Sequence, residues 1–138
     1  VTTAEKARSL RKKPVYITGH QGIPANRNNF HMFARPGMGL AMGEEYDFKP
    51  EDYLVYRMAG VTQKDIDALY IYDVFSPTLW MVLERFGFCP VGEAHTWIQG
   101  GRIQLGGELP VNTNGGMMSE GDYTGYAPIA EMTRQLRN

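Results

Sequence analysis

The residues best suited to chemistry in this chain lie in four short stretches, and the first runs from Tyr72 to Pro77. It falls between a predicted strand and a predicted helix, and ligand sites in open α/β sheets lie beyond the carboxyl ends of strands. Tyr72 could donate a hydrogen bond to a developing oxyanion, and Asp73 could act as a base or orient another group. A buried tyrosine with a helix-capping aspartate is the alternative, and spacing alone favours it.

The second stretch is the asparagine- and glycine-rich segment 112–116. Paired glycines let the backbone approach a ligand closely and adopt positive φ, so Asn112, Gly115 and Gly116 are candidate substrate-binding residues. An Asn-Gly hairpin turn is the alternative, again favoured by spacing alone.

The third stretch places Asp122 and Tyr123 just before the last predicted helix. Both side chains could act as acid–base groups beside a helix N-terminus, where negative charge is stabilised. The alternative is a helix cap, because an isolated Gly-Asp-Tyr sequence is a weak signal of function.

The fourth stretch holds the one cysteine of the chain, Cys89. Its neighbours are apolar, which favours a buried, inert thiol over a nucleophile. His20, His31 and His95 lie far apart without metal-ligand spacing, so we expect no metal site. Phosphate-loop, dinucleotide-fold and nucleophile-elbow motifs are also missing from the sequence. We expect no covalently bound cofactor.

The elements that must position these residues alternate between strands and helices, which indicates an α/β fold. Thr2 and Glu5 have capping-box spacing and predict a helix to about Lys12. Strands are predicted at 15–18, 69–72 and 109–112, and the segment 20–49 is predicted to be an irregular excursion. Further helices are predicted around Leu54, Met58 and Val61; from Ser76 to Gly87; and over 127–136 with Ile129, Met132 and Leu136 inward.

The composition limits the function classes. The chain has 138 residues, of which 43% are apolar, so a hydrophobic core is possible. Its formal charge of −1 gives no strong positive field that would favour binding of nucleic acid. It contains no apolar run long enough to span a bilayer. A single cysteine fits a reducing compartment, and we expect a cytoplasmic protein.

Several stretches, in order, resemble the C-terminal domain of the thiolase superfamily, in particular sterol-carrier-protein-type thiolases and their lipid-transfer-protein-like relatives. The opening helix and strand look like the family's, and residues 110–116 resemble its "PVNTSGG" segment. Three further matches are Ala59-Gly60-Val61 with Asp65-Ile66-Asp67, Phe86-Gly87-Phe88-Cys89 with Gly92-Glu93, and the closing Gln135-Leu136-Arg137.

Two departures from the family pattern carry the functional expectation. The family's HDCF motif is matched by Tyr72 to Phe75, and its GHP motif by Gly121-Asp122-Tyr123, so both histidines are replaced. An ionised aspartate has no proton to donate and would repel an enolate, so ordinary Claisen chemistry is not expected. The chain is similar in this respect to the thiolase-fold aldolases of steroid side-chain degradation, which implies Tyr72 as oxyanion donor and Tyr123 with Asp122 in proton transfer.

The resemblance also implies an assembly. It implies the C-terminal part of a thiolase-like fold, a mixed sheet with helices on both faces, with the N-terminal half and final strands missing from 1–138. It further implies a homodimer, an OB-fold acyl-CoA-binding partner subunit, and coenzyme A as part of the thioester substrate. Retro-aldol cleavage of a β-hydroxyacyl-CoA is the first expectation; an acyl-transferring thiolase and a non-catalytic acyl-CoA- or lipid-binding subunit are the alternatives.

Overall fold

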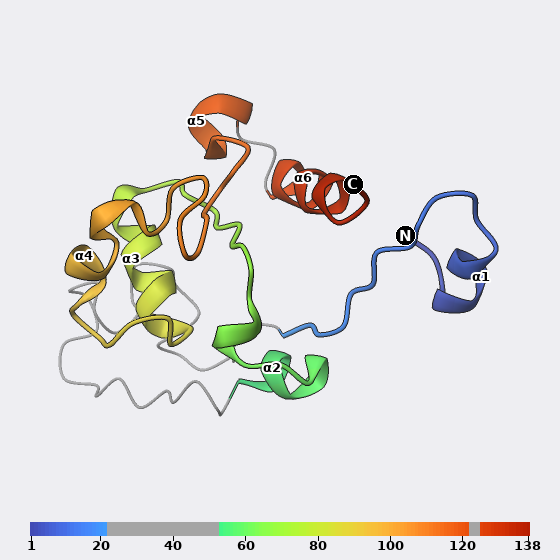
Figure 1. The fold of residues 1–138 in the computed structure, drawn as a ribbon, viewed down its shortest axis with the longest axis horizontal. Helices are drawn as coiled ribbons and strands as arrows, with labels where there is room; N and C mark the ends of the chain where they lie inside the picture. Colours follow the sequence, from blue (N-terminus) through green and yellow to red (C-terminus); the bar gives the residue numbers. More distant parts are fainter. Residues whose placement is uncertain (22–52, 122–124) are drawn as a thin grey trace.

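The computed structural model describes residues 1–21, 53–121 and 125–138, and in these ranges it consists of helices joined by extended segments and turns (Figure 1). The predicted excursion at 20–49 therefore lies almost entirely outside the described residues. The helices are α1 (Ala4–Arg8), α2 (Leu54–Ala59), α3 (Ser76–Arg85), α4 (Ala94–Trp97), α5 (Gly116–Glu120) and α6 (Tyr126–Gln135), with 3₁₀ turns η3 (Gln63–Asp65) and η4 (Gln99–Gly101). None of these helices is long and apolar enough to cross a membrane.

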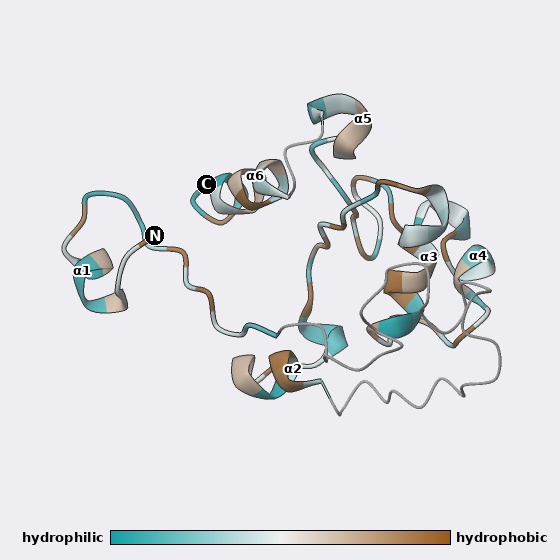
Figure 2. Cartoon of the chain, turned by 180° about the vertical axis from the view of Figure 1, so that it is seen from behind, coloured by the Kyte–Doolittle hydropathy of each residue, from teal (hydrophilic) through white to brown (hydrophobic). Residues whose placement is uncertain are grey.

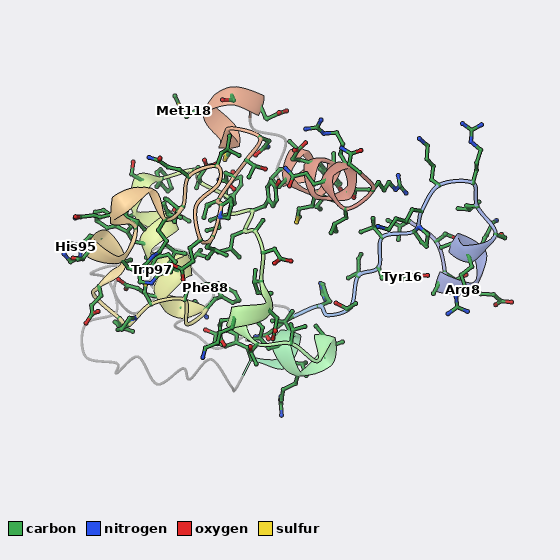
Figure 3. The ribbon with its side chains drawn as sticks, in the orientation of Figure 1. Arg8, Tyr16, Phe88, His95, Trp97 and Met118 are labelled. Carbon is green, nitrogen blue, oxygen red and sulfur yellow. The ribbon has the colours of Figure 1, made fainter. Side chains whose placement is uncertain are left out.

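The core lies where α3 meets α4. Leu83 of α3 is fully buried and contacts Cys89, Ala94 and Leu109, which are also buried. Phe88 and Trp97 pack against this cluster, and Figure 3 places both beside α3 and α4. The predicted apolar face of α3 is confirmed, because its central residue forms the middle of the core.

The predicted sheet is represented by one contact in the described residues. Leu69 and Val111 form an isolated parallel bridge. The N–H of Leu69 donates to the carbonyl of Pro110 at 2.9 Å, and the N–H of Asn112 donates to the carbonyl of Leu69 at 2.9 Å. The segments 69–72 and 109–112 thus lie side by side, but neither forms a longer strand in the described ranges, and the mixed sheet stays a prediction.

The N-terminal prediction is wrong in two details. The helix ends at Arg8 rather than near Lys12, and its cap is Thr3, whose Oγ1 accepts from the N–H of Lys6 at 3.3 Å. No residue of α1 is buried, and so short a helix has little stability in water without packing. The extended segment at 15–18 carries apolar residues but makes no sheet pairing in the described ranges, and with α1 it lies apart from the core (Figure 2).

The apolar face predicted around Leu54 and the inward face predicted for the last helix are largely exposed in the described part of the chain. Leu54 and Met58 of α2 are 47% and 53% exposed, and Ile129 of α6 is 56% exposed. Helix α2 ends at Gly60, whose φ of 68° stops it before Val61. The periodicity identified the helices correctly, but their apolar faces are only partly covered: Val61 and Met132 are half-buried.

Candidate functional site

The side chain of Asn112 extends the pairing between the two central segments. Its Oδ1 accepts from the backbone N–H of Ile71 at 2.8 Å, and its Nδ2 donates to the carbonyl of Ile71 at 3.0 Å. The side-chain amide of Asn112 thus pairs with the backbone of Ile71 in the way that a peptide group would if the pairing continued beyond the Leu69–Val111 bridge. Asn112 itself has a φ of 48°, a backbone conformation that asparagine tolerates better than most residues. The substrate contact predicted for Asn112 stays a prediction, since both polar atoms of its side chain already have partners.

This pairing places Asp73 next to the start of α5. Its Oδ1 accepts from the N–H of Met117 at 3.0 Å, a bond that joins residues 44 positions apart. Met117 lies in the first turn of α5, where backbone N–H groups lack partners within the helix. The capping half of the alternative is therefore correct in kind, although Asp73 caps a helix distant in sequence rather than α3, whose N-cap is Phe75. The buried-tyrosine half is wrong, because Tyr72 is 36% exposed.

The paired glycines fit this close approach. Gly116 is buried with a φ of 66°, and a Cβ placed on it would lie 2.1 Å from Oδ2 of Asp73. Gly115 has a φ of 92°, and its N–H donates to the carbonyl of Asn112 at 2.8 Å. The Asn-Gly sequence thus forms a tight turn, but the turn leads into α5 instead of a hairpin strand.

A small cleft brings several predicted site residues together. Tyr72, Asp73 and Gly116 line it, whereas Asn112 and Gly115 do not. The other lining residues come from the same strand-like segment, from the turn and α5, and from the start of α6: Ile71, Asn114, Met117, Glu120, Gly121, Gly125, Ala127 and Pro128. Its cavity volume is about 10 Å³, the space of one water-sized group.

Asp122 and Tyr123 lie outside the described residues. Gly121 and Gly125, which flank them, both line the cleft. The described residues on either side of this stretch therefore border the same cleft as Tyr72 and Asp73.

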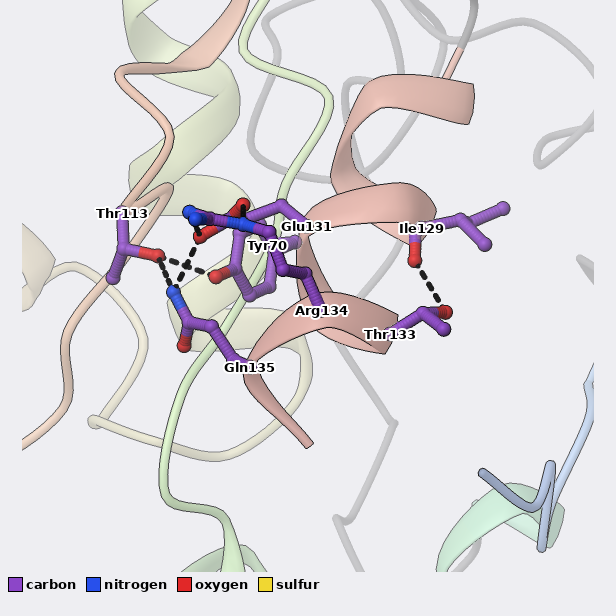
Figure 4. Close-up of polar contacts among 7 residues, drawn as sticks. All are labelled: Tyr70, Thr113, Ile129, Glu131, Thr133, Arg134 and Gln135. Atoms are coloured by element: carbon purple, nitrogen blue, oxygen red, sulfur yellow. Dashed lines mark hydrogen bonds and ion pairs between the residues drawn. The ribbon is translucent and has the colours of Figure 1, made fainter. Parts of the chain in front are cut away.

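A polar network beside the cleft was not predicted from the sequence. Figure 4 shows the hydroxyl of Thr113 between the hydroxyl of Tyr70 and the side chain of Gln135. Nε2 of Gln135 donates to Thr113 Oγ1 at 2.6 Å and to Glu131 Oε1 at 2.7 Å, and Arg134 donates to the same carboxylate twice at 2.8 Å. These bonds lower the pKa of Glu131, with Arg134 the largest cause and Gln135 the next. The network ties α6 to the turn at 112–116, and the only sequence signal for it was the Gln-Leu-Arg resemblance.

Cys89 is buried, as predicted. Burial raises the pKa of its thiol to about 11, and the charges of Glu84 and Glu93 add to the effect. A thiol with so high a pKa supplies almost no thiolate near neutral pH, so it is a poor nucleophile. Within the described ranges no group of three or more metal-ligating His, Cys, Asp or Glu side chains occurs; His31 lies outside those ranges.

Two tyrosines near the core are structural. Tyr56 donates its hydroxyl to the carbonyl of Phe86 at 3.0 Å, and Tyr53 stacks on the same phenylalanine with ring centroids 5.0 Å apart. Burial raises the pKa of Tyr56 to about 12, and Tyr53 adds to the shift. Neither tyrosine lines the cleft that holds Tyr72.

Comparison with known proteins connects this arrangement to a family. Residues 53–138 match the thiolase C-terminal domain-like family. Over 142 residues the chain is 39% identical to a 17-hydroxy-3-oxo-4-pregnene-20-carboxyl-CoA lyase of Mycobacterium tuberculosis, covering 99% of this chain and 35% of the lyase. Over 144 residues it is 35% identical to a steroid side-chain-cleaving aldolase of Thermomonospora curvata, covering 99% of this chain and 34% of the aldolase.

A solved structure agrees with these relatives. The Ltp2-ChsH2(DUF35) aldolase matches with a TM-score of 0.59 at 40% sequence identity, over 61% of this chain and 22% of the matched chain. The chain spans about a third of the length of the two curated relatives.

Proposed function

Since this chain belongs to the thiolase C-terminal domain-like family, we propose that it is part of a lyase that cleaves a β-hydroxyacyl-CoA by a retro-aldol reaction. The single observation that supports this best is the cleft, because it joins Tyr72 and Asp73 to the two glycines that flank Asp122 and Tyr123. The relatives named as a CoA lyase and an aldolase support the same reaction class.

For the proposed reaction the protein must supply a base and a hydrogen-bond donor. A base removes the proton of the β-hydroxyl group, the bond between Cα and Cβ breaks, and the β-carbon leaves as an aldehyde or ketone. The electron pair of the broken bond forms a thioester enolate, which takes up a proton at Cα to give a shortened acyl-CoA. Stabilising the enolate requires a hydrogen-bond donor at its oxygen, and no acyl-enzyme is formed.

We assign the donor role to Tyr72 and the proton transfer to Tyr123 with Asp122. A phenol that stays protonated can donate to the enolate oxygen without adding negative charge. Asp73 holds the N–H of Met117, so we assign it a positioning role: it keeps α5 and the turn before it against Tyr72. Gly116 serves the same purpose, because only a glycine leaves room for that carboxylate.

The remaining features of the proposal concern the substrate, the partner subunit and the assembly. Their names contain a steroid side chain and a CoA thioester, and we propose both for the substrate of this protein. The matched structure is named as a complex, which supports an acyl-CoA-binding partner subunit of the OB-fold type. A thiolase-like homodimer, a cytoplasmic location and a domain spanning 1–138 complete the proposal.

The reaction can be tested by incubating the complete protein with a β-hydroxyacyl-CoA that carries a steroid ring system. The expected result is release of a ketone or aldehyde together with a shortened acyl-CoA, without added coenzyme A. Tyr72→Phe should lower kcat by about 10²–10³-fold, the usual cost of removing one oxyanion donor. Asp73→Asn should retain most activity, because an amide oxygen can still accept from Met117.

Other outcomes would contradict the proposal. Cleavage of a β-ketoacyl-CoA that depends on added coenzyme A would indicate an acyl-transferring thiolase. Binding of acyl-CoA with no turnover of either substrate would indicate a non-catalytic subunit. Wild-type turnover by Tyr72→Phe would remove this tyrosine from the mechanism.

A further inference from the structure

The side chain of Asn114 has one satisfied end and one unsatisfied end. Its Oδ1 accepts from the N–H of Gly116 at 3.3 Å, so the oxygen faces the backbone of the turn. Its Nδ2 is shielded from solvent and has no hydrogen-bond partner among the described residues. A buried donor left unpaired destabilises the folded protein, so a ligand that supplies the missing acceptor would stabilise it.

Asn114 lines the same cleft as Tyr72 and Asp73. The charged groups that line it are the carboxylates of Asp73 and Glu120, and an ionised carboxylate only accepts hydrogen bonds. The donors among the lining side chains are therefore the amide of Asn114 and the hydroxyl of Tyr72. Two neutral donors suit an uncharged carbonyl oxygen, because the two carboxylates of the lining would repel a group that binds as an anion.

The size of the cleft limits what can enter it. A cavity volume of about 10 Å³ holds one oxygen-sized group and no acyl chain. The bulk of a substrate would therefore lie outside, with a single polar atom inserted between the turn and residues 71–73.

We propose that Nδ2 of Asn114 donates a hydrogen bond to the carbonyl oxygen of an acyl thioester, and that this bond strengthens when the oxygen becomes an enolate. The inference rests on the proposed function for the identity of the ligand. It assigns a second oxyanion donor, in addition to Tyr72, to a residue that the sequence did not single out.

The inference can be tested by binding measurements with two ligands. One is an acyl-CoA without a β-hydroxyl group, which cannot be cleaved, and the other is the corresponding thioether, which lacks the carbonyl oxygen. The complete wild-type protein should prefer the thioester, and Asn114→Ala should lower the ratio of the two affinities about tenfold, the equivalent of one hydrogen bond. Asn114→Asp keeps an acceptor for Gly116 but loses the donor, so it should lower the ratio at least as much.

Asn138→Asp is the matched control. Asn138 is exposed at the last position of the chain and does not line the cleft, so its substitution should leave the affinity ratio unchanged. Thermal unfolding of each variant separates loss of folding from loss of the donor. If both Asn114 variants fail to fold, the side-chain amide resonance of Asn114 in wild-type protein should shift with the thioester and stay in place with the thioether.

The outcomes separate this inference from the proposed reaction. An unchanged affinity ratio in a folded Asn114→Ala protein, or an unmoved amide resonance, overturns the role of Asn114 even if the wild type cleaves its substrate. An Asn114-dependent preference in a wild type that cleaves no β-hydroxyacyl-CoA upholds the donor and overturns the reaction. Failure of the wild type to bind either ligand overturns both.

Discussion

The carboxylate of Asp73 occupies the space that a side chain at position 116 would need. A Cβ on Gly116 would lie 2.1 Å from Oδ2, while Oδ1 of the same carboxylate accepts from Met117 at 3.0 Å. The glycine therefore allows the carboxylate to reach the first turn of α5. This contact joins the segment that carries Tyr72 to the turn that carries Asn114, and the arrangement of the cleft depends on it.

Gly116→Ala should lower the free energy of unfolding and reduce activity. The new methyl group would clash with Asp73, and the φ of 66° is itself unfavourable for alanine by about 1–2 kcal/mol. Gly60→Ala is the matched control, because Gly60 has a φ of 68° and nothing within 4 Å of the added Cβ. Urea unfolding of the two variants should show a larger loss of stability for Gly116→Ala. Equal losses of stability would mean that the close contact with Asp73 does not add to the cost of the substitution.

Asn112→Ala should lose stability through the backbone of Ile71. The substitution leaves the N–H and carbonyl of Ile71, a buried residue, without the partners at 2.8 and 3.0 Å. Two unsatisfied backbone groups should cost about 2–6 kcal/mol, which chemical denaturation would measure. Asn138→Ala, at the exposed C-terminal residue, should change stability by less than about 0.5 kcal/mol. A loss of similar size in both variants would show that the Asn112 amide does not hold the two segments together.

How much of this could be predicted depended on distance along the chain. Helix α3 was predicted because Pro77, its apolar spacing and the terminating Gly87 all lie within a few residues of one another. The bonds from Asn112 to Ile71 and from Asp73 to Met117 span 41 and 44 residues, and no local pattern encodes them.

The cleft was partly predictable for the same reason. Tyr72 and Gly116 were identified by residue type and by position relative to a predicted strand or turn. Asn114 was not, because its only distinguishing property is an amide nitrogen left without a partner by the fold. The turn at 112–116 was predicted, but whether it continued into a strand or a helix depended on the distant carboxylate of Asp73.

Cys89 should be inert in the native state and should make stability depend on pH. Its thiol stays protonated in the fold up to a pKa of about 11, whereas the ordinary value is 9.0. Between these pH values the unfolded chain has already released the proton, so the stability contributed by burying the neutral thiol is present below pH 9 and is lost as the pH rises towards 11. Cys89→Ala, which cannot titrate, should show a smaller fall in stability over this range. Rapid alkylation of the native wild type by iodoacetamide at pH 8 would contradict the buried position.

The link between Thr113 and Gln135 should hold α6 against the turn at 112–116. Thr113→Val and Gln135→Ala each break the 2.6 Å bond between Oγ1 and Nε2, so the double variant should lose less stability than the sum of the two single variants. Because Gln135 is exposed, the coupling should be modest, on the order of 0.5–1 kcal/mol. Thr133→Val is the matched control: its hydroxyl donates only within α6, to the carbonyl of Ile129 at 2.8 Å, so it should show no coupling to Gln135→Ala beyond error (Figure 4). Strictly additive losses for Thr113→Val and Gln135→Ala would mean that α6 is held in place by other contacts, and Gln135 would then have no part in shaping the cleft.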